Sequence, residues 1–396
     1  MKRIFHLPLV ALLLWCFCCT VLGNDSSYYV SGNQLVPVDE KNISVIKEVL
    51  TIEMGDDGYA YVDVDYVFRN NGPAKSITMG FEASLPYNGG LPSIHPMGIH
   101  PYIKNFTVEV NSESLPYSSG IVIPKRSMEP LDMQKWHYEA EASSDAEEGM
   151  WDLENGFLTD GKDSVRDVAC AYYFKAHFKH GLNRVHHTYS YCMGTSVISY
   201  YNLDYNLTPA LRWANHRIDD FTLRIGAKKG VKHFWILDPT FRSAPFRVVS
   251  GKGKVRHLKG DPDKFVYSDY TEVTLRHGML EWKAKNFQPI DELYLTSPMN
   301  VQAMIGTTYD TAGISYAYNL DFKSVFGREP KDDDEKQAFA TRVLRNMPYA
   351  GRGYVFRDQH LRKFFSSQWW YMPDPSWKMS ADDFSEHDMK LINENK

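Results

Sequence analysis

The 396-residue sequence is poor in cysteine and contains none of the common short catalytic signatures. It has no G-x-S-x-G nucleophile elbow, no H-E-x-x-H zinc motif and no phosphate-binding loop. Only five cysteines are present, and none lies beside a histidine that would activate it. We therefore expect a non-enzymatic protein without catalytic residues or cofactor. An active site built from distant residues stays an alternative.

The sequence also lacks a strong charge of one sign and, beyond its first residues, a long apolar run. Its formal net charge is −5 with acids and bases interspersed, whereas a nucleic-acid-binding surface is basic. No segment after residue 23 has the roughly 20 consecutive apolar residues that a membrane-spanning helix needs. We expect no nucleic-acid partner and no transmembrane segment in the mature chain.

The start of the sequence has the pattern of a signal peptide. A basic beginning precedes the apolar stretch 7–23, and Val21 and Gly23 are small enough for positions −3 and −1 of a cleavage site. Removal of residues 1–23 begins the mature chain at Asn24. An uncleaved membrane anchor is the alternative, but the polar residues that follow at once favour cleavage. We expect an exported protein.

Two cysteines remain after cleavage, Cys170 and Cys192. Exported chains commonly oxidise such a pair, and these two flank a predicted strand, turn and strand. We therefore predict a Cys170–Cys192 disulfide. A shared metal ion is the weaker alternative, because neither has a close cysteine neighbour.

Much of the mature chain alternates between apolar and polar residues, as strands do. In YVDVDYVF the apolar side chains fall on one face and Asp63 and Asp65 on the other. Repeated strand and turn signals predict an antiparallel β-sandwich body, with a first segment at 24–124 and a second at 167–300. The two segments could form one sandwich together or one sandwich each, and the sequence leaves both alternatives open. Residues 125–166 lose the period and are predicted to be a polar loop or insertion. The apolar side chains on one face of YVDVDYVF are Val62, Val64, Tyr66 and Phe68.

The pattern changes to helical spacing after a predicted linker at 301–336. Acids at the start of the next segment and arginines near its end suit a helix dipole. We predict one helix that ends at Pro348, a second capped by Asp358 and a third capped by Ser385. Residues 337–396 are therefore a small α-helical domain behind a mainly β body.

This C-terminal stretch, LRNMPYAGRGYVFRDQHLRKFFSSQWWYMPD followed by FSEHDMKLI, resembles the YARHG domain, an extracellular bacterial module. It departs from the family signature at Gly351 and Arg352, which stand where Arg and His are usual. The resemblance implies a bacterial cell-envelope setting, in the periplasm or at the cell surface, and no particular reaction. The matching positions are Asn346, Tyr349, Ala350, Gly353, Tyr354, Phe356, Phe365, Trp370, Tyr371 and Pro373.

A second resemblance lies at the mature N-terminus. NDSSYYVSGNQLVPVDEKNISVIKEVLTIEM and VDVDYVFRNNG are similar to a family of exported, β-rich bacterial proteins of unknown function that begins Asn-Asp-Ser. This resemblance implies no activity. The matching positions are Asn24, Asp25, Ser26, Gly32, Leu35, Phe68 and Asn70.

Aromatic and arginine side chains of the C-terminal domain are the candidate ligand-binding residues. Aromatic rings stack on sugar rings, and arginine donates paired hydrogen bonds. The alternative, which helical spacing favours, is that most of these rings form the core of the domain, Trp370 and Tyr371 among them. The ligand-binding hypothesis names Arg352, Arg362, Trp369 and Trp377.

Four histidines gather in a further stretch, but they do not predict a metal site. In a regular strand at most two of them converge, and no carboxylate lies nearby in the sequence. Asp63 and Asp65 are interpreted as the solvated side of a strand rather than as the paired acids of a glycosidase. The histidines are His177, His180, His186 and His187.

These features predict an exported, non-enzymatic cell-envelope protein whose C-terminal domain binds peptidoglycan, another envelope glycan or an envelope protein. Two alternatives stay open. The first is a glycan or peptide hydrolase with this domain as a targeting module, which convergent carboxylates in a pocket or a histidine with a metal partner would favour. The second is a structural or assembly protein, which a large exposed apolar patch would favour.

Overall fold

The computed structural model describes the chain in segments between residues 25 and 394. The predicted signal peptide, residues 301–319 of the predicted linker and Ser385 lie outside the described residues. The described segments are 25–31, 34–38, 40–55, 57–83, 103–122, 137–142, 151–159, 161–162, 164–165, 169–194, 199–227, 232–237, 240–260, 268–298, 320–380, 383–384 and 386–394.

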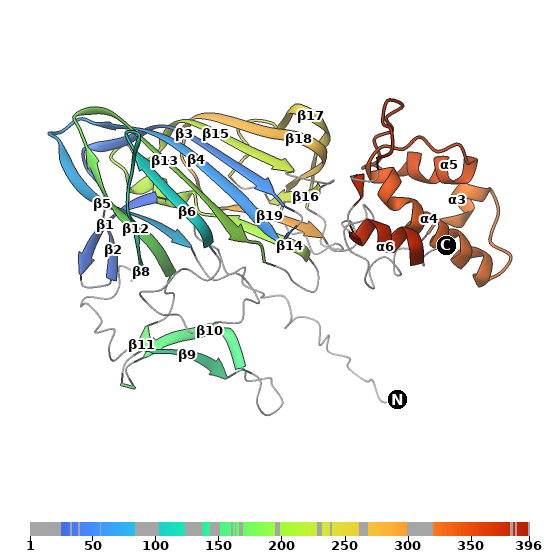
Figure 1. The fold of residues 1–396 in the computed structure, drawn as a ribbon, viewed down its shortest axis with the longest axis horizontal. Helices are drawn as coiled ribbons and strands as arrows, with labels where there is room; N and C mark the ends of the chain where they lie inside the picture. Colours follow the sequence, from blue (N-terminus) through green and yellow to red (C-terminus); the bar gives the residue numbers. More distant parts are fainter. Residues whose placement is uncertain are drawn as a thin grey trace, which may run out of the picture.

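The body is built from strands, with one short 3₁₀ helix, η1 (Thr208–Arg212). The predicted mainly β body is confirmed (Figure 1). Its strands are β1 (Asp25–Ser31), β2 (Gln34–Val38), β3 (Ile43–Met54), β4 (Tyr59–Asn70), β5 (Lys75–Ala83), β6 (Ile103–Val110), β7 (Glu113–Ser114), β8 (Ser118–Val122), β9 (His137–Ala142), β10 (Trp151–Thr159), β11 (Ser164–Val165), β12 (Ala169–Phe178), β13 (Gly181–Cys192), β14 (Ser199–Tyr205), β15 (Ile218–Ala227), β16 (Lys232–Leu237), β17 (Arg247–Leu258), β18 (Tyr270–Phe287) and β19 (Leu293–Pro298).

Eleven strands form one large sheet in the order β14-β19-β16-β18-β15-β3-β4-β13-β6-β7, with β17 paired to β18. The sheet is mixed, because β15 runs parallel to β3 with Leu223 opposite Leu50. The prediction of an antiparallel body is therefore wrong at this pair. Alternation decides which face a side chain takes but not which strand lies alongside. The two predicted β segments, 24–124 and 167–300, contribute strands to this one sheet.

A closed ring of five strands, β1-β2-β8-β12-β5, packs against one face of the large sheet. Aromatic side chains join the two layers. The rings of Phe68 on β4 and Phe178 on β12 lie 5.5 Å apart, centroid to centroid, and those of Phe81 on β5 and Tyr189 on β13 lie 4.4 Å apart. One continuous hydrophobic core therefore holds both layers together.

The predicted alternation on β4 is confirmed. Its apolar side chains face the core, and Asp63 and Asp65 are exposed on the opposite face. Each apolar side chain gains stabilisation from burial, on the order of 1.5–3 kcal/mol, while the acids keep their hydration. The buried residues are Val62, Val64, Tyr66 and Phe68.

The predicted hairpin between the two cysteines is wrong, and so is their disulfide. Gly181, with φ of 89°, does reverse the chain, but β12 then pairs with β5 and β8 in the ring, whereas β13 pairs with β4 and β6 in the large sheet. Cys170 lies opposite Ala83 and Cys192 opposite Tyr59. Cys192 is a free, half-buried thiol, and its burial raises its pKa.

The predicted polar loop at 125–166 contains a small sheet of its own. Its three strands lie in the order β11-β10-β9 and pair antiparallel. Figure 1 shows this sheet beneath the body. Strand β9, HYEAEA, alternates between polar and apolar residues, which is a short period-two signal inside the otherwise polar stretch.

The predicted small C-terminal helical region is confirmed. It contains α3 (Phe322–Phe326), α4 (Asp333–Gly351), α5 (Gln359–Ser367) and α6 (Glu386–Glu394), which share a core of their own. Helix α3 and the first residues of α4 lie within the predicted linker 301–336. Asp358 caps α5 as predicted, accepting a hydrogen bond from the backbone N–H of Leu361 at 2.9 Å. The prediction that Pro348 ends a helix is wrong, because α4 continues to Gly351. Pro348 lies in the last turn, where its missing N–H removes a single hydrogen bond.

None of the helices in the described part of the chain is long and apolar enough to cross a membrane.

Candidate functional site

The helical region contacts one face of β16, β17 and β18, which we call the docking face. Its side chains are His233, Lys254, Arg256, Glu272 and Arg276. Figure 1 shows the helices beside the end of the large sheet where these strands lie.

Arg276 is the buried anchor of the docking face. Its Nη1 donates hydrogen bonds to the backbone oxygens of Arg352 at 2.9 Å and Met372 at 3.2 Å, and its Nη2 lies 2.6 Å from Asp374 Oδ2. The guanidinium passes directly beside Gly353, where an added Cβ would be 2.0 Å from Nη1. Gly353 also has a φ of 88°, so only glycine combines this backbone with this contact.

Trp369, a predicted ligand-binding residue, lies on the docking face. The Arg256 guanidinium stacks over its ring at 4.3 Å, and the His233 ring meets it edge-on with centroids 6.2 Å apart. Lys254 Nζ donates to the backbone oxygens of Trp369 at 2.7 Å and Tyr371 at 2.9 Å. The structure therefore places this tryptophan between the two parts of the protein.

His233, Glu272 and Arg256 form a polar network beside Trp369, in which His233 and Glu272 are buried and Arg256 is partly exposed. His233 Nε2 lies 3.0 Å from Glu272 Oε1, and Arg256 Nε donates to the other carboxylate oxygen. Burial lowers the pKa of His233 below its usual value. Burial of Glu272 by itself raises its pKa, but the hydrogen bonds from His233 and Arg256 outweigh burial and the pKa is lowered. The network is a neutral imidazole beside a carboxylate that stays ionised.

Arg352, a second predicted ligand-binding residue, joins α6 to the end of α4. Its Nη2 lies 2.5 Å from Asp388 Oδ2, its Nε donates to the Asp383 oxygen at 2.6 Å, and its Nη1 donates to the Pro348 oxygen at 2.8 Å. The guanidinium also stacks on the Phe384 ring at 4.5 Å. These contacts hold the C-terminal helix in place.

The other two predicted ligand-binding residues face solvent to different degrees. Arg362 is exposed on α5, and Trp377 is half-buried. The Trp377 ring meets the Tyr354 ring at a centroid distance of 6.2 Å, and Tyr354 is 38% exposed. The hydroxyl of Tyr371 donates to the Tyr354 backbone oxygen at 2.5 Å, which fixes this loop. Tyr354 and Trp377 therefore form a partly exposed aromatic pair.

The remaining family-motif residues mostly build the core of the helical region. Tyr349 is half-buried, Asn346 donates to the Arg342 oxygen at 2.7 Å, and Pro373 is exposed. The buried members are Ala350, Phe356, Phe365, Trp370 and Tyr371.

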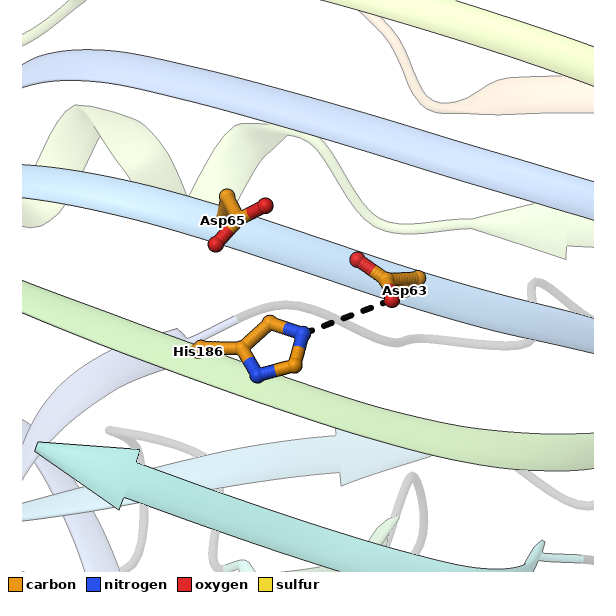
Figure 2. A group of neighbouring side chains, drawn as sticks. All are labelled: Asp63, Asp65 and His186. Atoms are coloured by element: carbon orange, nitrogen blue, oxygen red, sulfur yellow. Dashed lines mark ion pairs between the residues drawn. The ribbon is translucent and has the colours of Figure 1, made fainter. Parts of the chain in front are cut away.

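A second polar cluster lies on the exposed face of β4 and β13, and Figure 2 shows its three side chains pointing toward one another. The ligand atoms of Asp63, Asp65 and His186 lie within 4.8 Å of one another. His186 Nε2 is 3.3 Å from Asp63 Oδ2. The expectation that no carboxylate approaches these histidines is wrong, because β13 pairs with β4 and sets His186 opposite Asp65.

The four histidines themselves do not converge. His187 is buried, with its ring 5.5 Å from that of Phe81. His177 Nδ1 lies 3.1 Å from Ser76 Oγ, and His180 Nδ1 lies 3.0 Å from the Gly72 oxygen. Only His186 joins the cluster with Asp63 and Asp65, and no local sequence signal could reveal it because the pairing of β4 with β13 is long-range.

Among solved structures, a Legionella pneumophila protein provisionally described as nutrient binding is similar to this chain. It is 19% identical with a TM-score of 0.49, and the alignment covers 95% of this chain and 99% of that one. An M1 zinc metallopeptidase from Deinococcus radiodurans is 8% identical with a TM-score of 0.27, covering 66% of this chain and 44% of that one. At these scores neither likeness supports an inference about activity. No curated protein matches the chain.

Residues 327–396 match the sequence model of the YARHG domain. The match confirms the resemblance that the motif residues carry, and it begins just before α4, so it includes the three helices α4 to α6. The resemblance of the mature N-terminus to an exported β-rich family stays a prediction. The chain therefore carries a C-terminal YARHG domain behind a mainly β body.

Proposed function

We propose that this is an exported, non-enzymatic protein of the bacterial cell envelope, in the periplasm or at the cell surface, that binds peptidoglycan through the exposed side of its YARHG domain. The observation that carries the proposal is the Tyr354–Trp377 pair. These rings remain partly exposed in a domain that buries most of its other aromatic side chains.

The chemistry of the pair suits a sugar ring. Aromatic faces stack on the C–H faces of sugars, and two rings at nearly right angles, here 83°, offer a corner rather than a flat surface. Lys378 follows Trp377 in the chain and is exposed, and in this proposal its ammonium pairs with a carboxylate of peptidoglycan.

The β body serves as the scaffold in this proposal. The ring of strands packed on the large sheet is a sandwich with one closed layer, and its docking face engages the backbone of the YARHG domain through Arg276 and Lys254. Trp369 and Arg352 make contacts inside the protein, so we assign ligand binding to Trp377, another residue of the predicted set, together with Tyr354.

Sedimentation with purified peptidoglycan sacculi tests the proposal. The chain from residue 24 to residue 396 should co-sediment, and Trp377→Ala should weaken binding about three- to tenfold, as expected for the loss of one stacking ring. Tyr354→Ala should do the same. Tyr117→Ala, which removes a 42% exposed tyrosine of the β body, is the matched control and should bind as the unaltered chain does.

Two results would contradict the proposal. An unaltered chain that stays in the supernatant removes peptidoglycan as the ligand. Equal binding by the Trp377→Ala and Tyr117→Ala variants moves the binding surface away from the aromatic pair.

A further inference from the structure

The cluster of Asp63, Asp65 and His186 lies in the middle of the large sheet, far in the sequence from the YARHG domain. Both strands that carry it have neighbours on each side, because β4 lies between β3 and β13 and β13 lies between β4 and β6. A side chain on a central strand is held more precisely than one on a loop, so the three groups start from fixed positions.

The two carboxylates of the cluster have fewer basic partners than Glu281, an acid on the same face of the sheet. Strand pairing aligns Asp63 with Thr51, then Arg224 and then Glu281 across four neighbouring strands. In this row Glu281 is paired with Arg224 Nε at 3.0 Å and with Lys283 Nζ at 2.7 Å. Within the described residues, no lysine or arginine forms an ion pair with Asp63 or Asp65.

A further carboxylate lies next to this uncompensated charge. Glu109 on β6 is directly opposite His186 and is exposed. Side chains that face each other across antiparallel strands have Cβ atoms about 4.5–5.5 Å apart. Three acids therefore surround one imidazole on this part of the sheet, and a bound cation would offset their mutual repulsion.

We propose that Asp63, Asp65 and His186 bind a divalent first-row transition-metal ion, with Zn²⁺ as its representative. Imidazole nitrogen together with carboxylate oxygen suits such ions, whereas Ca²⁺ and Mg²⁺ prefer oxygen ligands alone. Three protein ligands leave at least one coordination position open to water.

The distances agree with this ion. Zinc bonds to nitrogen and oxygen of about 2.0–2.2 Å place two ligand atoms of a tetrahedral site about 3.4 Å apart. His186 Nε2 and Asp63 Oδ2 are 3.3 Å apart, and the widest separation in the cluster is within 4.8 Å. A rotation of the exposed Asp65 side chain is therefore enough to close the site.

A simple ion pair between His186 and Asp63 is the alternative, and Asp65 distinguishes the two. The ion pair needs only two of the three residues, whereas the metal site needs all three. Asp65→Asn keeps the size and exposure of the side chain and removes its charge, so it should leave the fold intact while it removes a metal ligand.

Isothermal titration of the untagged chain, residues 24–396, with Zn²⁺ tests the proposal, and Co²⁺ adds a visible absorption spectrum of the bound ion. We expect one ion per chain at this site. Asp63→Asn, Asp65→Asn and His186→Asn should each weaken binding by more than the roughly 10- to 100-fold that removal of an outer-shell partner typically costs.

Two control variants separate this site from other zinc-binding groups. His257→Asn removes an exposed histidine whose Nε2 lies 3.9 Å from Asp269 Oδ2, a pair of the same kind without a third ligand. Cys192→Ser removes the free thiol. Both should bind Zn²⁺ with unchanged affinity. Binding that survives Asp65→Asn unchanged, or that is lost with either control variant, overturns the proposal.

Discussion

Two polar regions of the same large sheet differ in what surrounds their carboxylates. On the docking face, Glu272 is contacted by His233 and Arg256 and lies beneath the YARHG domain. In the cluster of Asp63 and Asp65, the carboxylates face solvent, and His186 is the one basic side chain within ion-pair distance among the described residues. Matched and covered charges join parts of a protein, whereas unmatched exposed charges can receive a ligand.

The same contrast holds between two arginines of the YARHG domain. Arg352 is largely buried and makes three hydrogen bonds that hold α6 to α4, whereas Arg362 is exposed on α5. Sequence reasoning treated both as ligand-binding candidates. The surroundings of a guanidinium, rather than its presence, therefore decide between structure and recognition.

Removal of the glycine at the docking face should have the largest effect. Gly353→Ala forces an alanine into the left-handed region, at a cost of about 1–2 kcal/mol. It also displaces the buried Arg276 guanidinium from its hydrogen bonds to the backbone oxygens of Arg352 and Met372, each of which adds about 1.5–3 kcal/mol. The free energy of urea unfolding, followed by tryptophan fluorescence, should fall accordingly.

Gly327→Ala is the matched control for this change. Gly327 has a similar φ of 74°, but an added Cβ there meets nothing within 4 Å. It should show the backbone cost alone. Equal losses for the two variants would mean that Gly353 acts through its backbone and not through Arg276.

Arg352→Met should have the next largest effect. Its partner Asp388 has a side chain only 6% exposed, so removal of the guanidinium leaves a buried carboxylate, and the YARHG domain should lose about 3–5 kcal/mol of stability. Arg362→Met, on the exposed side of α5, should change the unfolding midpoint little. Comparable losses for both arginines would remove the distinction between them.

The smallest of these effects is a dependence of the docking face on pH. Burial lowers the pKa of His233 below 6.5, and hydrogen bonds lower that of Glu272 below 4.5 despite its burial. Both shifts make the unfolded chain bind more protons than the folded one. The stability is therefore complete above about pH 6.5 and declines as the pH falls, first through His233 and then through Glu272.

Urea unfolding midpoints between about pH 7.5 and pH 4 check this dependence. Glu272→Gln should flatten the part of the curve below about pH 4.5. A curve of the same slope for this variant and for the unaltered chain would show that other groups cause the acid sensitivity.

Local features of the sequence were sufficient where a local rule determines the structure. The alternation on β4 predicted which face of the strand is buried, and Asp358 was identified as a helix cap, because both depend on neighbours in the chain. The YARHG motif was recognisable for the same reason. The position of Pro348 inside α4 shows the limit, since a single proline in a last turn does not end a helix.

Features that depend on strand pairing were not predictable. The disulfide prediction assumed that β12 and β13 pair, but they enter different layers. The approach of His186 to Asp65 requires the pairing of β13 with β4, and the stacking of Trp369 with Arg256 requires contact with the β body. Alternation determines on which face of a strand each side chain lies, but the same pattern fits any neighbouring strand.

The parallel pairing of β3 with β15 has a consequence for how the chain folds. Val45 accepts and donates hydrogen bonds with the side chain of Asn215, which lies 170 residues further along the chain. Such distant contacts slow folding, because the chain loses the entropy of a long loop before the contact stabilises it. Strand β3 lacks its second neighbour until β15 has been synthesised, so a fragment that ends before residue 218 exposes an open edge of β3.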